Sequence, residues 1–188
     1  MLLGLALAAI VALVGVTLAL RKALARERRL ARTDDVTGVR NARAFYESAA
    51  AEIERARRYQ HPFSVAAVDL GYRVGDELLR SAAAALRGAL RATDVIARLG
   101  RDEFIVLLPE TPAAATRVVL EKLRTGMVDV RTGDGRQIAT SIGGVTFLTP
   151  PGGVDAIVRA ADERIAAAKS TGTPSHTTWD APSLAEGR

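Results

Sequence analysis

Residues 95–108 read VIARLGRDEFIVLL, and residues 63–70 read FSVAAVDL. The first stretch holds two apolar runs of strand length, joined by the polar tetrapeptide Gly100-Arg101-Asp102-Glu103. That pattern is typical of a β-hairpin with acidic residues at its tip. The second stretch predicts a buried strand that ends in the carboxylate of Asp69. If the hairpin lies beside this strand, one end of a sheet gathers several carboxylates.

The rest of the chain alternates helical and strand patterns around this hairpin. Helical spacing of apolar residues predicts helices over 42–59, 76–90, 112–125 and 154–170. Further strands are expected at 138–148, where Gly143-Gly144 is expected to interrupt the strand, and over a short stretch at 176–179. The pattern indicates an α/β domain, an α+β sandwich with helices covering a mostly antiparallel sheet.

Composition restricts the chemistry of the chain. The 188 residues are enough for one domain with an attachment, and 48% are hydrophobic, so a packed core is expected. The chain has no cysteine and two histidines, which excludes a disulfide framework, a thiolate zinc site and a histidine-rich metal cluster. Any metal would therefore be held by carboxylates.

The N-terminus predicts a membrane anchor. Residues 1–20, MLLGLALAAIVALVGVTLAL, carry no charged side chain and suffice to cross a bilayer as a helix. A cleaved signal peptide is the alternative, but it requires basic residues before the apolar run, whereas here they follow it. The positive-inside rule then predicts a single-pass protein of the inner membrane with its domain in the cytoplasm.

Charge is concentrated beside that segment. Residues 21–32 carry six basic side chains and one acidic one, which equals the net charge of +5 of the whole chain, so the remainder is neutral. Contact with anionic lipid accounts for this cluster, and no nucleic-acid partner is expected. The predicted organisation is a transmembrane helix at 1–20, a basic juxtamembrane helix or linker at 21–35, a domain at 36–180 and a flexible tail at 181–188.

Four motifs in order resemble the GGDEF-domain family, whose active members are diguanylate cyclases. Residues 34–45, DDVTGVRNARAF, resemble the opening DxLTGLxNRRxF signature, and 97–104, ARLGRDEF, resemble ARYGGDEF. Residues 141–143, SIG, resemble the next strand of the family, and Asp162, Lys169 and Gly172 match the closing ADxALYxAKxxGRN helix. The resemblance covers most of the chain after residue 33.

The resemblance implies a nucleotide-cyclase palm-like fold and condensation of two GTP molecules to cyclic di-GMP and pyrophosphate, in a dimer. It implies Mg²⁺ or Mn²⁺ as the cofactor of an active member, because two metal ions neutralise the triphosphate during attack. By position, the implied metal ligands are Asp69, the Leu70 carbonyl and Asp102. The implied catalytic residues are Glu103 and Asp102, and the substrate-binding positions are Asp76 at the guanine edge, Gly100 at the hairpin tip and Lys169 on phosphate.

The departures from the family pattern fall on this chemistry. The family continues after Asp69 as DxDxFKxxND, whereas here Asp69 runs through GYRVG into Asp76, so about ten residues are absent, leaving a short-loop connection. Arg101 replaces a glycine at the hairpin tip, where it is expected to cost conformational energy and fill nucleotide space; the alternative is that its guanidinium grips phosphate. Ala166 and Thr173 replace a tyrosine and an arginine. Phosphate and guanine contacts are thereby reduced.

A second family feature is intact. Residues 91–94, RATD, form an RxxD motif five residues before Gly100, the spacing of the cyclic di-GMP inhibitory site. An arginine fork suits phosphate and guanine, and Asp94 suits the guanine edge. The alternative is a surface salt bridge between Arg91 and Asp94 at helical spacing.

Three functions remain open at this point. The favoured interpretation is a membrane-anchored GGDEF-family domain with weak or no catalysis that binds cyclic di-GMP at Arg91 and Asp94, alone or paired with an active relative. The alternative is an active diguanylate cyclase. A third is a scaffold that only dimerises through residues 21–35.

Overall fold

The computed structural model describes residues 13–18, 21, 31–71, 74–173 and 175–179. The chain forms two compact units, residues 1–32 and 33–188. In the first unit residues 13–18 are helical, while most of the predicted 1–20 helix and of the basic 21–35 segment lies outside the described residues. Within the described ranges, no helix has the length and apolar character needed to span a membrane.

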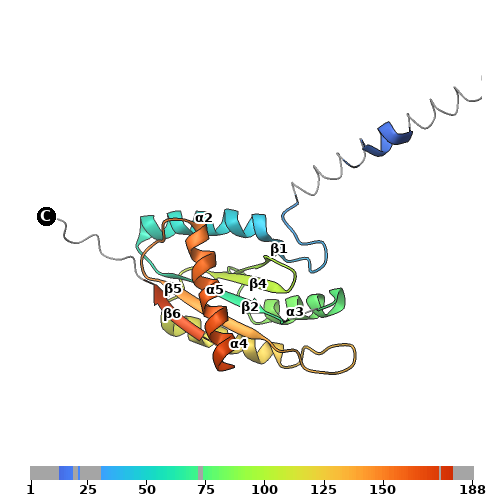
Figure 1. The fold of residues 1–188 in the computed structure, drawn as a ribbon. Coiled ribbons are helices and arrows are strands. Elements are labelled where there is room, and N and C mark those ends of the chain that lie inside the picture. Colours follow the sequence, from blue (N-terminus) through green and yellow to red (C-terminus); the bar gives the residue numbers. More distant parts are fainter. Residues whose placement is uncertain (1–12, 19–20, 22–30, 72–73, 174, 180–188) are drawn as a thin grey trace, which may run out of the picture. The chain divides into compact units, whose positions relative to one another are not determined.

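The second unit is built on one sheet and its covering helices (Figure 1). Its elements are β1 (Arg40–Asn41), α2 (Ala42–Tyr59), β2 (Phe63–Asp69), α3 (Asp76–Gly88), β3 (Val95–Arg98), β4 (Glu103–Leu108), α4 (Ala113–Met127), β5 (Ser141–Phe147), α5 (Val154–Thr171) and β6 (Ser175–Trp179). The helices and strands predicted for this unit are confirmed. The structure adds the strand β1, whose two residues are too few to give a recognisable sequence pattern.

The sheet is mixed, which corrects the prediction of a mostly antiparallel one. Its strand order is β1-β3-β4-β2-β5-β6. The pairs β3–β4, β4–β2 and β2–β5 are antiparallel, while β1–β3 and β5–β6 at the two edges are parallel. The parallel edge at β6 has a simple cause: the long helix α5 carries the chain back between two neighbouring strands, as parallel pairs require.

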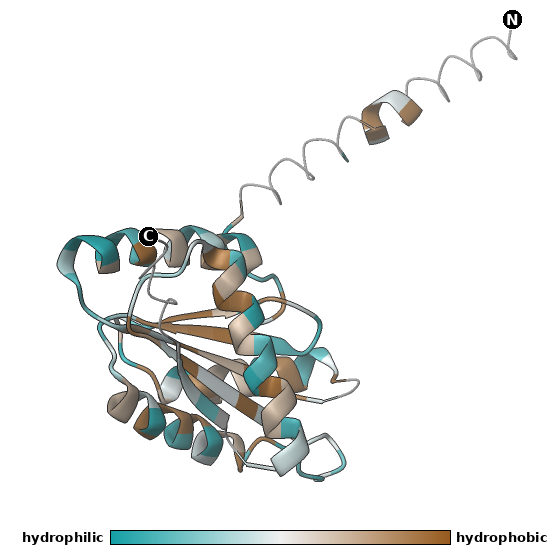
Figure 2. Ribbon diagram, turned by 60° about the vertical axis from the view of Figure 1, so that its left-hand side comes forward, coloured by the Kyte–Doolittle hydropathy of each residue, from teal (hydrophilic) through white to brown (hydrophobic). Residues whose placement is uncertain are grey.

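Two hydrophobic clusters, one on each face of the sheet, hold these layers together. Phe45 and Ile53 of α2 and Ile157 of α5 pack with Phe63, Val65 and Ala67 of β2. On the other face, Leu79 of α3 and Leu123 of α4 pack with Ala66 and Val68 of the same strand. Successive residues of a strand point to opposite faces, so the central strand β2 is buried on both sides along its whole length. Figure 2 shows the strands coloured largely toward the hydrophobic end of the scale.

The paired glycines do not interrupt β5, contrary to the prediction. The strand runs without a break from Ser141 to Phe147, opposite β2 in register. A Cβ at Gly143 would lie 2.6 Å from the carbonyl carbon of Arg164 and 2.7 Å from the amide nitrogen of Ile165, both in α5. A Cβ at Gly144 would meet the side chain of Leu120 on the other face. The glycines therefore let helices approach the sheet closely on both sides.

The segment predicted at 21–35 as a helix or linker is not helical in its last five residues. Residues 31–35 lie outside any helix, and Thr33 forms an isolated bridge with Arg40. Asp34 instead opens a turn, because its carboxylate accepts hydrogen bonds from the amide and hydroxyl of Thr37. A short polar side chain that bonds local backbone competes with helix formation in this way.

Replacement of Gly143 by alanine tests the close helix contact. We expect Gly143→Ala to lower the free energy of unfolding by about 1–3 kcal/mol, because helix and strand backbones cannot yield as a side chain can. Gly144→Ala is the matched control, since its Cβ meets only methyl groups of Leu120, at 2.9–3.0 Å. Urea unfolding followed by circular dichroism measures both. Equal stability of the two variants would mean that the α5 contact does not limit packing.

Candidate functional site

Asp69 lies at the end of β2 between two facing residues, one on each neighbouring strand. In the register of the sheet, Asp69 is directly opposite Glu103 on β4 and Ser141 on β5. Directly opposed residues of an antiparallel pair share a face, and Ala67, two residues before Asp69, packs in the α2–α5 cluster. The three side chains therefore form a row across the sheet on the side covered by α5.

The Asp69 carboxylate is buried and engaged at both oxygens. It is 6% exposed. Oδ2 accepts a hydrogen bond from Lys169 Nζ of α5 at 2.8 Å, and Oδ1 accepts one from the Gly71 amide at 2.9 Å. The Asp69 hydrogen bond is the main cause that raises the pKa of Lys169 above its ordinary value. Lys169 thus holds a carboxylate in this arrangement, instead of standing free for phosphate.

Glu103 lies in a strongly acidic environment. Although the residue is exposed, partial desolvation of its carboxylate is the main cause that raises its pKa, and the negative charges of Asp162, Asp69 and Asp102 add to the effect while Lys169 opposes it. Asp162 of α5 also has a raised pKa because of burial. Neither carboxylate hydrogen-bonds or ion-pairs with any residue in the described ranges. Two carboxylates therefore share this end of the sheet without a cation of their own.

Asp162 is the functional candidate that the sequence analysis missed. It appeared there only as part of a motif, without a role. The signal that identifies it is its position seven residues before Lys169, since residues seven apart lie on one face of a helix after two turns. Ala166, four residues after Asp162, lies between them on that face.

A cavity of about 240 Å³ lies under this helix face. Its charged lining residues are Asp69, Glu103, Asp162 and Lys169, and its other lining residues are Ala67, Val68, Leu99, Phe104, Ile105, Ile165 and Ala166. Ala67 and Ile105 are buried, whereas Glu103, Asp162 and Ala166 are exposed. The cavity therefore has an apolar floor and an acidic rim.

The hairpin tip is held by Arg98. Its Nη1 donates to both carboxylate oxygens of Asp34 at 3.1 and 3.2 Å, and its Nη2 donates to the carbonyl of Arg101 at 2.6 Å. The pKa of Asp34 is lowered overall, because its bonds to Thr37 and Arg98 outweigh burial, the largest single effect, which acts in the opposite direction. Arg98 thus joins the turn before α2 to the tip between β3 and β4.

Arg101 is not strained, which corrects the expected conformational cost. Among the described non-glycine residues, positive φ angles occur at Gln60 and Glu110, and Arg101 is not one of them. Gly100 next to it is tightly placed, because a Cβ there would lie 3.0 Å from Glu103 Oε2. The tip thus tolerates arginine at 101 without a glycine conformation.

Two of the predicted metal ligands, Asp69 and Asp102, make contacts within the protein. Within the part of the chain that the structure describes, no three acidic or histidine side chains are grouped to hold a metal ion. Both Asp69 oxygens are engaged, and the Leu70 amide donates to the Asp102 carbonyl at 3.0 Å. The metal assignment of Asp69, Leu70 and Asp102 therefore stays a prediction.

Asp76 is separate from this cluster. It begins α3 after the short connection from Leu70 to Gly75, and its side chain is 66% exposed, 4.0 Å from Arg80. It does not line the cavity that contains Asp69 and Glu103. The domain thus folds with the short connection, as predicted. Asp76 is an exposed acidic residue in the first turn of α3.

The Arg91–Asp94 segment forms a turn and not the helical salt bridge considered as the alternative. Asp94 Oδ2 accepts a hydrogen bond from the Arg91 amide at 2.8 Å, and the Asp94 amide donates to the Arg91 carbonyl at 3.1 Å. The Arg91 side chain is exposed and makes no hydrogen bond or ion pair with a residue that the structure describes. The carboxylate thus fixes the turn and leaves the guanidinium available.

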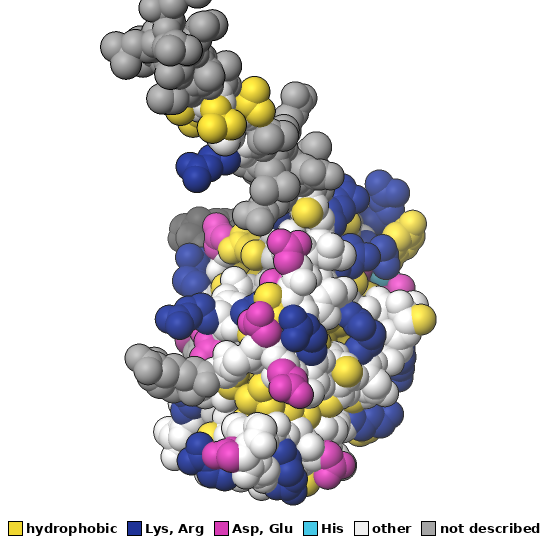
Figure 3. Space-filling view, turned by 90° about the vertical axis from the view of Figure 1, so that its right-hand side faces the viewer, with side chains coloured by type: hydrophobic (Ala, Val, Ile, Leu, Met, Phe, Trp, Pro, Cys, Tyr) yellow, Lys and Arg dark blue, Asp and Glu magenta, His cyan; other side chains and the backbone are white. Residues whose placement is uncertain are grey.

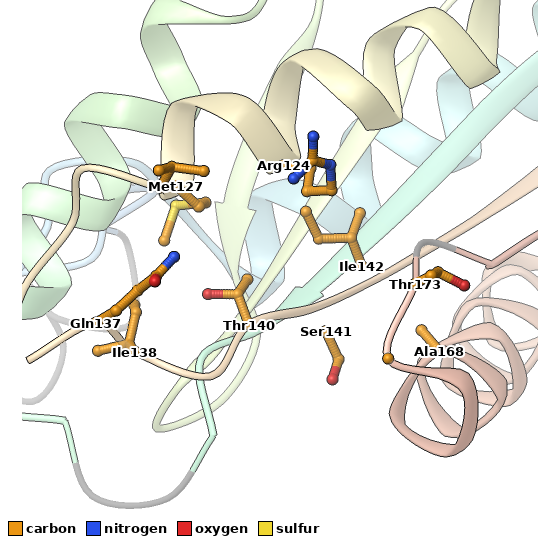
Figure 4. Close-up of a pocket in the computed structure, with 11 residues that line it drawn as sticks. Arg124, Met127, Gln137, Ile138, Thr140, Ser141, Ile142, Ala168 and Thr173 are labelled. Carbon is orange, nitrogen blue, oxygen red and sulfur yellow. The ribbon is translucent and has the colours of Figure 1, made fainter.

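A second cavity, of about 210 Å³, borders the first residues of β5 (Figure 4). Thr140 and Ser141 point their hydroxyl groups to different sides, and Thr173 lies across from them near the end of α5. The basic side chain that lines the cavity, Arg124, is already bound to Glu121 through Nε at 2.9 Å. The lining residues therefore offer no unpaired cation for a phosphate.

Positive and negative side chains are mixed on one face of the second unit. On the face drawn in Figure 3, Lys and Arg side chains of the second unit are interspersed with Asp and Glu side chains. This face lacks the single-sign field that nucleic-acid interfaces present.

Removal of the lysine tests the Asp69–Lys169 pair. The Lys169 side chain is 52% exposed, so solvent screens the pair, and we expect Lys169→Met to lower the free energy of unfolding by about 1 kcal/mol at pH 8. A raised lysine pKa means that this contribution is complete below the ordinary lysine pKa and is lost as pH rises through the raised value. The difference between variant and parent should therefore shrink above about pH 10.4. Urea unfolding at several pH values measures it.

Lys122→Met on α4 is the control for that experiment. Lys122 is exposed and pairs with no residue of the described ranges. A Lys169→Met curve that coincides with the Lys122→Met curve at every pH would contradict a stabilising pair.

Comparison with known proteins identifies the family to which this domain is similar. The family model for the diguanylate cyclase GGDEF domain matches residues 31–175. Diguanylate cyclase DgcP of Pseudomonas aeruginosa is 33% identical over 159 residues, which are 78% of this chain and 24% of that protein. The chain thus spans about a quarter of the length of this curated relative.

Solved structures of GGDEF-domain proteins have a similar fold. The diguanylate cyclase SiaD of Pseudomonas aeruginosa, in complex with its activator SiaC, superposes with a TM-score of 0.70 at 25% identity, covering 87% of this chain and 68% of that one. The GGDEF domain of DgcB from Caulobacter crescentus, in complex with cyclic di-GMP, has a TM-score of 0.69 at 21% identity. It covers 78% of this chain and 92% of that one, and at this identity shows the shared fold alone. With its family model matched over residues 31–175, the chain belongs to the GGDEF-domain family.

Proposed function

We propose that this chain is a membrane-anchored GGDEF-family domain of cyclic di-GMP signalling that binds cyclic di-GMP at Arg91 and Asp94 and has weak or no catalysis. The observation that supports the proposal is the contrast between the carboxylate end of the sheet at Asp69 and the turn at Arg91 and Asp94. The Asp69 carboxylate is engaged at both oxygens by Lys169 and Gly71, while the Arg91 guanidinium is exposed beside a turn that Asp94 fixes.

The acidic end supports weak catalysis. A cyclase of this family needs its carboxylates to hold cations and its lysine to hold phosphate. Here Asp69 and Lys169 bind each other. Glu103 is surrounded by the negative charges of Asp162, Asp69 and Asp102, and the one cation that opposes them, Lys169, already binds Asp69. A triphosphate would meet repulsion at this place until metal ions displaced Lys169 from Asp69.

The Arg91–Asp94 turn supports ligand binding. The Asp94 carboxylate holds the Arg91 amide with Oδ2, so its Oδ1 remains as an acceptor for a guanine edge. A guanidinium presents a planar set of donors that matches phosphate and guanine acceptors. Because the turn is already formed, the ligand does not have to order it, which favours affinity.

The anchor rests on the N-terminal stretch. Residues 13–18 are helical, and Leu13, Val14, Val16 and Leu18 expose at least half of their surface. An exposed apolar helix next to six basic residues suits a bilayer with the second unit on the cytoplasmic side of the inner membrane. Pairing with a second copy or with an active relative belongs to the same proposal, because an active family site needs two half-sites.

Binding of cyclic di-GMP is the direct test. We expect isothermal titration of the detergent-solubilised full chain to show saturable binding, and Arg91→Ala to weaken it at least tenfold, the size of one lost charge-assisted contact. Arg87→Ala is the matched control, because Arg87 is an exposed arginine in the last turn of α3, four residues before Arg91. Equal affinity of the Arg91→Ala and Arg87→Ala variants would contradict the assigned site.

Turnover of GTP separates this proposal from the active cyclase. We expect no cyclic di-GMP formation above background with GTP and Mg²⁺ or Mn²⁺, because the carboxylate that would hold the metal is held by lysine. Chromatography of the reaction mixture measures the product. Turnover that disappears in Asp102→Ala would establish the cyclase instead.

A further inference from the structure

A chain of buried hydroxyl groups crosses the α4 side of the sheet and ends on its edge strand. Ser64 on β2 and Thr146 on β5 are opposite each other in the sheet register, and their hydroxyl oxygens lie 2.8 Å apart. Thr116 on α4 donates to Ser64 Oγ at 2.6 Å, and these three side chains are fully buried. His176 on β6 closes the chain, because its Nε2 lies 2.9 Å from Thr146 Oγ1. None of these residues has a part in the proposed function.

The number of protons fixes the direction of these hydrogen bonds. A hydroxyl group carries one proton and can accept with two lone pairs. Ser64 donates its proton to the Thr111 carbonyl at 2.7 Å, so Thr146 is the donor in the contact between Ser64 and Thr146. With its proton used, Thr146 can only accept from His176. The Nε2 atom of His176 therefore carries a hydrogen, and in the neutral ring Nδ1 is the atom that can take up a further proton.

The surroundings of His176 disfavour that further proton. His176 is paired with Gly144 of β5, whose Cβ position is directed at a side chain of α4, so the imidazole shares the α4 face. β5 and β6 carry no other ionisable side chain, and α5 packs on the opposite face with Val145. Partial burial is the main cause that lowers the pKa of His176 below its ordinary value of 6.5, and the positive charge of Arg117 on α4 adds to this effect.

The strand that carries His176 has a neighbour on one side. β6 is the last strand of the sheet, beside β5 and with no further described strand on its other side (Figure 1). Such an edge opens at a smaller free energy than the strands of the core. In released β6 the imidazole is in water, where it takes up a proton at its ordinary pKa. A charged ring therefore favours release, while a neutral ring favours the pairing of β6 with β5.

We propose that His176 is a pH-sensitive latch for β6: the neutral ring holds the strand through its Nε2–H hydrogen bond to Thr146, and protonation at Nδ1 releases the strand. The hold is complete above pH 6.5 and is lost as the pH falls through 6.5 toward the lower pKa of the attached strand. Residues 172–174 alone separate β6 from α5, the helix that holds Lys169 on Asp69, so release also removes a restraint on the end of α5. The latch is independent of the proposed cyclic di-GMP site, so either can fail without the other.

Hydrogen exchange of the full chain in detergent tests the latch. Mass spectrometry reads the protection of β6 relative to β4, corrected for the intrinsic pH dependence of amide exchange. We expect the relative protection of β6 to fall at least about threefold between pH 7.5 and pH 5.0, because the released strand binds the proton more tightly. Relative protection that does not change over this range overturns the proposal.

His176→Gln separates the proton from the hydrogen bond. A glutamine amide nitrogen can donate to Thr146 but does not titrate, so this variant should keep the protection of β6 at pH 7.5 and lose its pH dependence. His61→Gln is the matched control, since His61 is the other histidine of the chain, and it should behave as the parent. A pH dependence that persists in His176→Gln, or one that disappears in His61→Gln, overturns the assignment.

The hydrogen bond itself is tested at Thr146. Thr146→Val removes the acceptor of the His176 Nε2–H and should lower the protection of β6 at pH 7.5. Thr178→Val is the control, because Thr178 is the exposed register partner of Thr146 and lies outside the hydroxyl chain. Equal protection of β6 in the two variants contradicts the latch. Nitrogen-15 nuclear magnetic resonance of the histidine rings at pH 8 reads the tautomer directly, and an Nδ1–H ring at His176 contradicts it as well.

Discussion

The contact of the α5 backbone with the β5 backbone at Gly143 is the constraint on which the acidic end of this molecule depends. A Cβ at that position would lie 2.6 Å from Arg164, so the helix sits as close to the sheet as two backbones allow. Lys169 follows Arg164 by five residues, which carries it about 7.5 Å along the helix axis to Asp69. The distance between α5 and the sheet thus determines both the Asp69–Lys169 ion pair and the depth of the cavity beside it.

Strand alternation decides which carboxylates can act together. Asp69 and Glu103 share the α5 face because they are opposed in an antiparallel pair, and Asp162 approaches them from the helix above. Asp76 begins a helix that packs on the other face, so it is not part of this group. The family resemblance assigns Asp69 and Asp76 to one nucleotide site, whereas here Asp69 lies on the α5 side of the sheet and Asp76 begins a helix that packs on the opposite face.

Much of the fold could be predicted from the sequence, because periodicity reports local conformation. Helix α2 begins and ends where the apolar spacing predicted, and Asn41 caps it through the Ala44 amide. What could not be predicted depends on partners distant in the chain. The parallel edges of the sheet, the unbroken path of β5 past two glycines and the unstrained Arg101 all follow from packing against other elements. In the candidate site the same holds: Asp69, Glu103 and Lys169 were recognised from motifs, but the Asp69–Lys169 pair and the position of Asp162 beside Glu103 appear only when α5 lies on the sheet.

The Arg98 bridge gives this domain a mechanical property. Asp34 is the second residue of the folded unit, and through Arg98 it is tied to the carbonyl of Arg101 by bonds of 2.6–3.2 Å. The chain that enters the domain is thus bonded both to the segment before α2, since the Asp34 amide donates to the Val39 carbonyl, and to the hairpin tip, through Arg98. A force on this chain would reach the acidic hairpin through the Arg98 contacts as well as through β1 and β3.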